Sequence, residues 1–180
     1  MKYLKTITLV VLTILLTSCS SDDDSNTLES NFIKVGESSF EMKAALVEPS
    51  LNSVFLSLAN KTEAEINASF SGITLNNVDY FTARINHLDL LSGEMYDLDD
   101  ISSLEFIVNG DVINSEFENG FSQFYKSGGS ADLEVTSGSI TVIDYTVDSI
   151  NLSFSFTRGD GTEIKGTYEG SFLYITSEDQ

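Results

Sequence analysis

The residue whose type and position point most directly to a chemical reaction is the one cysteine of the chain, Cys19. Lys2 and Lys5 give the N-terminus a positive charge, and residues 7–16 form an apolar run. A run of this length is typical of the central region of a signal peptide, and it is too short to cross a bilayer as a helix, which takes about 20 residues. One interpretation of this segment is an ordinary secretory signal cleaved near Ser18, with Cys19 left as a free thiol.

The residues that end this segment indicate a more specific fate for the cysteine. Leu16-Thr17-Ser18-Cys19 resembles the lipobox of bacterial lipoproteins, in which the cysteine thiol is acylated and becomes the first residue of the mature chain. The resemblance implies a signal peptide over residues 1–18 and lipidation of Cys19. It is favoured over an ordinary secretory signal because a single leftover cysteine is unusual in a secreted protein. Each buried CH₂ of an acyl chain adds about 0.8 kcal/mol, so several chains make a stable anchor.

A polar and acidic segment follows the cysteine. Residues 20–30 show no hydrophobic period and include the run Ser20-Ser21-Asp22-Asp23-Asp24, so residues 19–30 are interpreted as the lipidated cysteine and a flexible tether. An aspartate run directly after the lipidated cysteine resembles the surface-export signal of Bacteroidetes lipoproteins. That resemblance implies a protein anchored in the outer membrane and exposed at the cell surface. The alternative is a solvated linker that only holds the domain away from the bilayer.

The charge of the chain excludes several kinds of partner. Without residues 1–18, the chain has 162 residues with 7 basic and 28 acidic side chains, which gives a net charge of −21. Such a chain repels the phosphates of nucleic acids and anionic lipid head groups, whereas basic partners and divalent cations stay compatible with it. The expected partners are therefore the membrane, through the lipid anchor, and an envelope or extracellular protein, with no nucleic acid.

The chain offers few residues for catalysis. His87 is the only histidine, and Asp89 lies near it, but no G-x-S-x-G motif supplies the serine of a Ser-His-Asp triad. Zinc sites use several histidine or cysteine ligands, so that class is excluded. Pairs of carboxylates hydrolyse glycosides, but 28 acidic residues produce such pairs by chance, and with no tryptophan the sugar-stacking candidates are Tyr80, Tyr96 and Tyr125. We expect a binding module in preference to an enzyme, and no cofactor.

One acidic cluster has the composition of a calcium site. Glu94, Asp97, Asp99 and Asp100 lie close together in the sequence, and Ca²⁺ prefers several oxygen ligands on a flexible loop. The cluster lacks the full D-x-D-x-D-G-x₅-E pattern of an EF-hand. A solvated acidic loop is therefore the better interpretation, and the four residues are weak candidates for a metal site.

Two short motifs lie near expected turns. Arg158-Gly159-Asp160 matches the integrin-binding tripeptide, but a hairpin turn needs the pair Asp160-Gly161 at the same place. Asp148-Ser149-Ile150 matches a short O-glycosylation acceptor pattern of exported Bacteroidetes proteins. Tripeptides of this kind arise often by chance, so both motifs are weak evidence for a function.

The elements that position these residues are predicted to be strands. Apolar and polar residues alternate strictly over residues 150–157, which is the period of a half-buried strand. A second strand is expected over residues 163–175, with Asp160-Gly161 in the turn that joins the two as a hairpin. Gly166 and Gly170 in that second strand indicate a bulge or the close approach of another backbone.

Further strands are expected about every 8–12 residues. They comprise a hairpin of residues 32–35 and 40–47 that ends before Pro49, a buried run at 54–59, an alternating stretch at 66–70, and strands at 80–85 and 104–108. Residues 87–103 are the least strand-like and fit one turn of helix or a long acidic loop. The pattern predicts one all-β domain over residues 31–180, an antiparallel β-sandwich, with a lipocalin-like β-barrel as the alternative.

The last third of the chain contains a series of strand and turn motifs. They are Ser137-Gly138-Ser139-Ile140-Thr141-Val142, Asp144-Tyr145, the strand at 150–156, Gly159-Asp160-Gly161-Thr162 and Gly170-Ser171-Phe172. The series resembles a family of uncharacterised Bacteroidetes lipoprotein domains. Gly93-Glu94-Met95-Tyr96-Asp97-Leu98 is similar to that family's GTYxL element, with methionine in place of threonine, and Leu152-Ser153 replaces its usual Gly-Thr. The resemblance implies a fold, and it carries no activity or catalytic residue.

Three function classes follow from the sequence. The leading expectation is a surface-exposed outer-membrane lipoprotein that acts as a binding or interaction module, which should show an exposed apolar or aromatic patch. The second is a small-molecule carrier in a β-barrel, which needs an enclosed apolar cavity. The third is a carboxylate-based hydrolase, which needs convergent carboxylates in a cleft.

Overall fold

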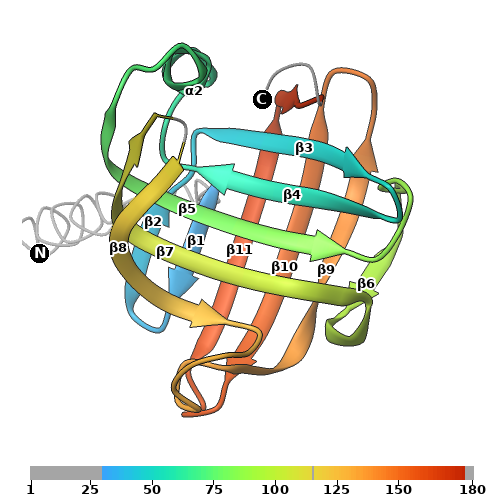
Figure 1. Ribbon diagram of the computed structural model, residues 1–180. Coiled ribbons are helices and arrows are strands. Elements are labelled where there is room, and N and C mark those ends of the chain that lie inside the picture. Colours follow the sequence, from blue (N-terminus) through green and yellow to red (C-terminus); the bar gives the residue numbers. More distant parts are fainter. Residues whose placement is uncertain (1–29, 115, 177–180) are drawn as a thin grey trace, which may run out of the picture.

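The fold consists of two β-sheets packed face to face (Figure 1). The computed structural model describes residues 30–114 and 116–176, so the predicted signal peptide and almost all of the predicted tether lie outside the described residues. Sheet A has the strand order β2-β1-β11-β10-β9-β6, and sheet B has the order β12-β3-β4-β5-β7-β8. The prediction of an all-β sandwich is therefore confirmed.

The strands of the two sheets alternate in blocks along the chain. Sheet A contains β1 (Phe32–Val35), β2 (Ser38–Glu41), β6 (Met95–Asp97), β9 (Val135–Tyr145), β10 (Ile150–Arg158) and β11 (Glu163–Gly170). Sheet B contains β3 (Ala44–Ser50), β4 (Ser53–Ala59), β5 (Leu75–Ile85), β7 (Ile101–Ile113), β8 (Glu116–Tyr125) and β12 (Phe172–Tyr174). Among the residues described, the helix α2 (Glu63–Phe70) and the 3₁₀ turn η2 (Leu98–Asp100) connect strands.

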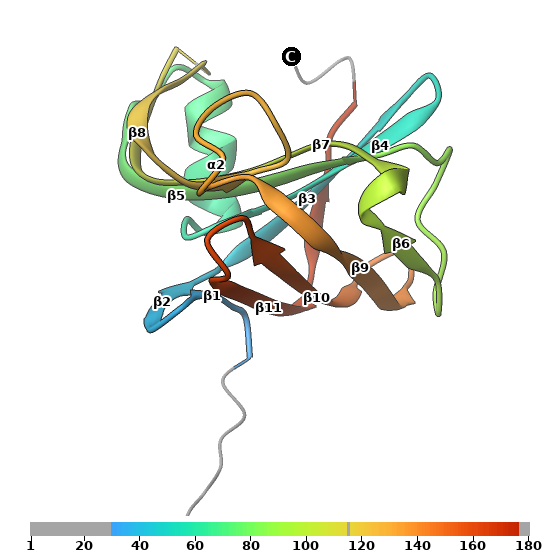
Figure 2. The same cartoon turned by 90° about the horizontal axis from the view of Figure 1, so that it is seen from below.

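The alternative of a lipocalin-like closed barrel is wrong, because the sheets do not close into one cylinder. Sheet A ends at β2 and β6, and sheet B ends at β12 and β8. Figure 2, seen from below, shows β5 and β7 in one layer and β10 and β11 in the other, and Figure 1 shows that the strands of the two layers cross. Neighbouring strands are antiparallel, with the exception of β12, which pairs in parallel with Ala45–Val47 of β3.

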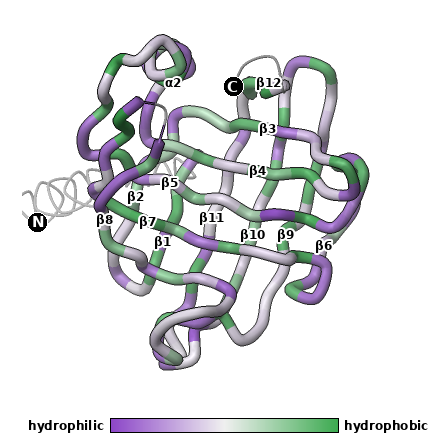
Figure 3. The backbone as a smooth tube through the Cα atoms, in the orientation of Figure 1, coloured by the Kyte–Doolittle hydropathy of each residue, from purple (hydrophilic) through white to green (hydrophobic). Residues whose placement is uncertain are grey.

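A core of apolar side chains holds the two layers together. Hydrophobic and hydrophilic segments alternate along the strands (Figure 3), because successive side chains of a strand point to opposite faces. The ring of Phe81 on β5 stacks on the ring of Phe154 on β10, with 4.7 Å between centroids and 6° between planes. Phe106 and Phe124 extend this cluster within sheet B, with 5.6 Å between their centroids. Aromatic pairs of this kind stabilise a core beyond the area they bury.

The hairpin of β10 and β11 is confirmed, but the predicted strand at residues 163–175 is two strands in different sheets, β11 and β12. Gly166 also has a different role from the one predicted. Phe154 pairs directly with Gly166, and the register along β10 and β11 shows no shift. A Cβ on Gly166 would overlap the ring of Phe154. Gly166 is therefore neither a bulge nor a contact with another backbone. It leaves room for an aromatic ring from the neighbouring strand, which then reaches Phe81 of the opposite sheet.

The predicted strand at residues 66–70 is wrong, because these residues lie in α2. Thr62 caps the helix: its hydroxyl accepts a hydrogen bond from the Glu65 amide, and the Glu65 carboxylate accepts one from the Thr62 amide at 2.8 Å. Hydrogen bonds from Thr62 also lower the pKa of Glu65. This reciprocal arrangement is a capping box, which fixes a helix start. Ile66 packs with Ala44 and Ala59, so α2 covers one end of the outer face of sheet B.

The predicted strand at residues 40–47 is two strands in different sheets. β2 ends at Glu41 in sheet A and β3 begins at Ala44 in sheet B. The amide of Met42 still bonds to the Asn31 carbonyl in sheet A, while the amide of Lys43 bonds to the Ala59 carbonyl in sheet B. The chain changes layer between these two residues, and the buried Met42 side chain lies in the core.

Two further expectations are settled by the observed elements. Pro49 does not end the strand before it but lies inside β3. β12 pairs only with residues 45–47 of β3, so the missing N–H of Pro49 removes no hydrogen bond between β3 and β12. Residues 87–103, expected to be a turn of helix or an acidic loop, hold β6, η2 and the start of β7. Within the described ranges, no helix has the length and apolar character needed to span a bilayer.

Replacing Phe154 with alanine is expected to lower the free energy of unfolding by about 3–5 kcal/mol, because the contact between the sheets is lost. Gly166→Ala should also destabilise the wild-type protein, because its methyl group meets the Phe154 ring. In the Phe154→Ala background the same change should be neutral or stabilising, because the ring is gone and glycine is costly in a strand. Urea denaturation of the four proteins measures this coupling.

The exposed neighbour Ser155 provides the matched control, and Ser155→Ala should change the free energy of unfolding by less than about 0.5 kcal/mol. An equal cost of Gly166→Ala in both backgrounds would show that the ring does not require the glycine.

Candidate functional site

The residues of the predicted anchor and export signal lie outside the described residues. These are Cys19, Ser20, Ser21, Asp22, Asp23 and Asp24. Their roles stay predictions from the sequence. The described chain begins at Ser30, directly before β1 of sheet A.

Five exposed apolar side chains lie on turns, a loop and an edge strand toward one end of the sandwich. They are Leu51 in the β3–β4 turn, Leu88 and Leu91 in the β5–β6 loop, Val147 in the β9–β10 turn and Tyr174 on β12, and they are between 53% and 91% exposed. We call these five residues the apolar end. Figure 1 shows the β3–β4 turn, the β5–β6 loop and the β9–β10 turn at the right and upper right of the molecule. Exposed apolar groups rimmed by polar residues are typical of an interaction surface.

Hydrogen bonds hold the β5–β6 loop of the apolar end against β9. The Ser92 hydroxyl, in the β5–β6 loop, accepts a bond from the Tyr145 amide at 2.8 Å and donates to the Asp144 carboxylate at 3.1 Å. The Gly93 amide also donates to the Val142 carbonyl at 2.8 Å. The β5–β6 loop is therefore fixed to the end of β9, so the exposed side chains sit on an ordered framework.

A contact between two aromatic rings joins β9 to β12 near the apolar end. Tyr145 packs against Phe172 with 5.4 Å between ring centroids, and these two rings line an open recess together with Val147 and Tyr174. Burial raises the pKa of the Tyr145 phenol, and the carboxylate of Asp89 adds to the rise. The recess therefore lies where β9, the β9–β10 turn and β12 meet.

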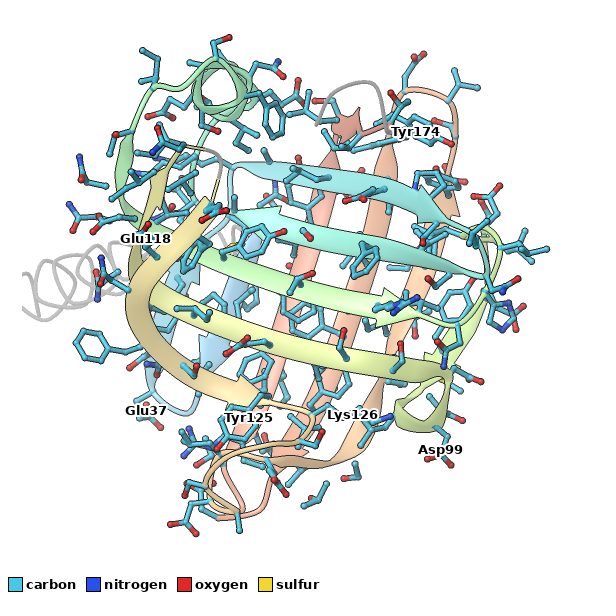
Figure 4. The ribbon with its side chains drawn as sticks, viewed as in Figure 1. Glu37, Asp99, Glu118, Tyr125, Lys126 and Tyr174 are labelled. Carbon is cyan, nitrogen blue, oxygen red and sulfur yellow. The ribbon has the colours of Figure 1, made fainter. Side chains whose placement is uncertain are left out.

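The acidic residues proposed as weak calcium ligands do not converge. The Asp100 carboxylate accepts a hydrogen bond from the Asp97 amide at 3.1 Å, which closes the start of η2. Asp99 and Glu94 are exposed, and Asp99 lies at the margin of the molecule (Figure 4). In the described part of the chain, no three His, Cys, Asp or Glu side chains are grouped in a way that could hold a metal ion.

His87 lies on the surface beside the apolar end. Its ring contacts the edge of the Tyr96 ring, with 5.0 Å between centroids, and its amide donates to the Ile85 carbonyl. Tyr96 is buried, and its phenol oxygen accepts a hydrogen bond from the Leu91 amide. The His87–Tyr96 contact helps to position the β5–β6 loop.

The Arg158-Gly159-Asp160 tripeptide is built into the β10–β11 turn. The Arg158 guanidinium pairs with the Asp160 carboxylate and also donates to the Gln123 carbonyl at 2.9 Å. The Asp160 carboxylate accepts a further bond from the Thr162 amide at 2.9 Å. A Cβ at Gly159 would overlap the backbone of Ala131. Each residue of the tripeptide thus has a role in the turn, and Gly161 adopts the positive φ of 84° that the turn requires.

The second short motif, Asp148-Ser149-Ile150, leads from the β9–β10 turn into β10. The Ser149 hydroxyl lies 2.9 Å from the Thr146 hydroxyl, and the Ser149 carbonyl accepts a bond from the Thr146 amide. The Ser149 side chain therefore takes part in closing the turn.

The outer face of sheet B, on the side away from sheet A, carries a row of polar side chains that the sequence did not predict. Ser57, Thr82, Glu105 and Tyr125 are cross-strand neighbours on β4, β5, β7 and β8. We call these four residues the polar row. The Ser57 hydroxyl donates to the Thr82 hydroxyl at 3.1 Å.

The polar row leads into a hollow of about 390 Å³. The residues that line it are Thr82, Ser102, Ser103, Leu104, Glu105, Ser122, Tyr125, Lys126, Ser127 and Gly128. Figure 4 shows Tyr125 and Lys126 at the end of β8, where the chain leaves the sheet. Of the three tyrosines considered for sugar stacking, Tyr125 lines this hollow and Tyr96 is buried in the core. Tyr80 lies in a recess beside α2 and donates its hydroxyl to Ser57 at 2.8 Å.

An apolar recess of about 170 Å³ lies between α2 and sheet B. Ile66 and Phe70 of α2 face Tyr80 and Phe117 across it, and the last two rings stack with 5.7 Å between centroids. Burial raises the pKa of the Tyr80 phenol. This recess lies on the outer face of sheet B and not between the sheets, where a barrel carrier would hold its ligand.

Comparisons with protein-family models, with curated proteins and with solved structures found no match for this chain. The resemblance to the Bacteroidetes lipoprotein domains therefore stays a prediction, and a function has to be inferred from the chain's own residues.

Replacing Asp160 with asparagine should destabilise the protein at neutral pH and have less effect in acid. Hydrogen bonds from Arg158 hold the pKa of Asp160 below the usual value of an aspartate, 3.8. Because the folded pKa is lowered, the stabilising contribution is fully present above the unfolded pKa and is lost as the pH falls through the folded value. Urea midpoints of both proteins at pH 7 and pH 3 measure the difference.

Asp148→Asn, a change at an exposed aspartate in the β9–β10 turn, is the control and should show a much smaller difference between the two pH values. A wild-type advantage over Asp160→Asn that stays constant down to pH 3 would contradict the ion-paired turn.

Proposed function

We propose that this protein is a lipoprotein exposed at the surface of the outer membrane, anchored through acylated Cys19, and that it binds an envelope or extracellular protein through the apolar end. The observation that supports the binding role is the apolar end itself, where five apolar side chains on four segments face solvent. Leaving them exposed has a cost, because each would be stabilised by removal from water. A partner that covers them recovers that energy.

The surroundings of the apolar end favour a partner of particular character. Asp89 and Asp148 lie in the same loops, Asp144 lies near the end of β9, and all three are exposed. The whole chain carries a formal net charge of −19. Complementary charge speeds association and selects partners. A partner surface with an apolar centre and a basic rim would fit both features.

The β-sandwich is well suited to this role. Turns and loops at one end of a sandwich provide the binding surface in other proteins with this architecture, because the sheets hold them in fixed positions. In this chain the Ser92 and Tyr145 contacts provide the same kind of support for the exposed loop.

Site-specific crosslinking in intact cells tests the binding role. A photo-crosslinking amino acid placed at Leu51 or Leu88 should give an adduct with one defined protein, whereas the same amino acid at Glu37 should not. Glu37 is exposed in the β1–β2 turn and lies far from Tyr174 in Figure 4. With the crosslinker at Leu88, Val147→Asp should reduce the adduct at least about tenfold, because a charge in an apolar interface costs binding energy.

Adducts of equal yield at Glu37 and at the apolar end, or an adduct that Val147→Asp leaves unchanged, would contradict a role for this surface. Thermal melting of Val147→Asp confirms that the variant is folded, since Val147 is 88% exposed.

Replacing Cys19 with alanine should abolish acylation and release the protein from the membrane fraction, because the acidic surface provides no attraction to anionic lipids. Replacing Asp22, Asp23 and Asp24 together with alanine should keep the protein in the membrane but reduce its digestion by protease added to intact cells. Membrane fractionation and surface proteolysis measure the two effects. A Cys19→Ala protein that stays membrane-bound would contradict the anchor, and unchanged digestion of the triple variant would reduce the aspartate run to a plain linker.

A further inference from the structure

The outer face of sheet B is covered at one end and open at the other. α2 packs on Ala44 and Ala59 at the covered end. At the other end, the outward side chains of β5, β7 and β8 face the hollow of about 390 Å³ described above. The outward face of an antiparallel sheet is usually solvated and polar. Where such a face is concave and several polar side chains point into the hollow, it has the features of a ligand site.

The groups that line this hollow include both hydrogen-bond donors and acceptors. The Ser122 hydroxyl donates to the Glu105 Oε1 atom at 2.7 Å, which orients the carboxylate. Within the described part of the chain, the Glu105 Oε2 atom and the hydroxyls of Ser103 and Ser127 make no hydrogen bond to protein, so they are available to a ligand. A carboxylate oxygen only accepts, whereas a serine hydroxyl both donates and accepts. This combination matches a ligand that carries several hydroxyl groups.

The charges of the hollow favour a neutral ligand. The one cation that lines it, Lys126, donates from its ammonium group to the carbonyls of Leu98 and Ile101 and is therefore already bonded. An anion placed in the hollow would meet the Glu105 carboxylate. A metal ion would find a single carboxylate among the lining residues, fewer than Ca²⁺ sites use.

The hollow also contains an aromatic ring in a fixed position. Tyr125 donates its hydroxyl to the Ser130 carbonyl at 2.9 Å, and a Cβ at Gly129 would overlap the tyrosine, so the loop after β8 packs tightly against it. The ring offers an apolar surface beside the polar groups, which suits a ligand with both C–H and O–H faces.

We propose that this hollow is a binding site for a neutral carbohydrate, in which Glu105 and Ser103 hydrogen-bond to sugar hydroxyls and Tyr125 contacts the sugar ring. The site binds without hydrolysis, because glycosidases use a pair of carboxylates and Glu105 is the one acidic residue among those that line it. None of the residues that line it belongs to the apolar end, so this proposal does not depend on the proposed protein partner.

Saturation-transfer NMR on the full chain tests this site. The protein is purified in a detergent without a sugar head group and mixed in turn with hexasaccharides of α-linked glucose, β-linked glucose, mannose, xylose and galactose, with trigalacturonate as an anionic comparison. At least one neutral hexasaccharide should bind with a Kd on the order of 1 mM, because each hydrogen bond replaces one to water and contributes modestly. Trigalacturonate should not bind.

Variants locate the binding in the hollow. Glu105→Gln should weaken binding of the neutral hexasaccharide about tenfold, since hydrogen bonds to a charged group are the stronger ones, and Ser103→Ala should weaken it about threefold. Glu163→Gln and Ser155→Ala make the same changes at exposed positions on the outer face of sheet A and should leave the Kd unchanged. Ser103 is exposed, so its variant is expected to keep the wild-type melting temperature.

Three results would overturn the proposal. One is that none of the five neutral hexasaccharides binds. Another is that only trigalacturonate binds. The third is that binding persists unchanged in both Glu105→Gln and Ser103→Ala. None of these results bears on the apolar end, whose test is crosslinking at Leu51 and Leu88.

Discussion

The packing of aromatic side chains between the two sheets is the interaction on which the rest of this structure depends. The chain has a single cysteine and so cannot form a disulfide within itself, which leaves apolar burial to hold the layers together. Phe81 and Phe154 meet face to face at the centre of this contact. Gly166 makes the contact possible, because its missing side chain leaves the space that the Phe154 ring occupies. Both candidate surfaces depend on this core, since the loops of the apolar end and the outward row of sheet B are positioned by strands whose other faces it buries.

The sequence predicted the fold best where local pattern and burial agree. Strict alternation over residues 150–157 identified β10, and the Asp160-Gly161 turn identified its partner strand. The same reasoning failed at Ile66, Ala68 and Phe70, whose alternation suggested a strand. The signal of a helix was present in Thr62 and Glu65, which are spaced as a capping box, and it outweighs three alternating residues. The change of sheet at Met42 and Lys43 left no comparable signal, because a strand pattern continues across it without interruption.

The sequence predicts a candidate site well when the site consists of consecutive residues, and poorly when the fold assembles it from distant ones. The anchor is a local motif, so Leu16-Thr17-Ser18-Cys19 predicts it from consecutive residues, although these lie outside the described structure. The polar row combines single residues from four strands that are neighbours only through the register of sheet B, and no spacing in the sequence reveals that register. The apolar end left a weak signal in the sequence, because Leu51 and Val147 are apolar residues within turns, where polar residues are usual. The acidic cluster shows the opposite error, since closeness in sequence did not bring four carboxylates to one point.

The edge strands of the two sheets determine whether two copies of this protein can pair with each other. An unpaired edge strand is a template for aggregation with another chain, and short edges or charged side chains prevent such pairing. β2, β6 and β12 are edges of three or four residues. The longer edge, β8, carries Glu116 and Glu118 and faces a break in register at Phe106 and Ile107. If the chain is confined to a membrane as proposed, its local concentration is high and its neighbours approach from the side. Edges of this kind would keep such crowded copies monomeric, leaving the exposed loops for a different molecule.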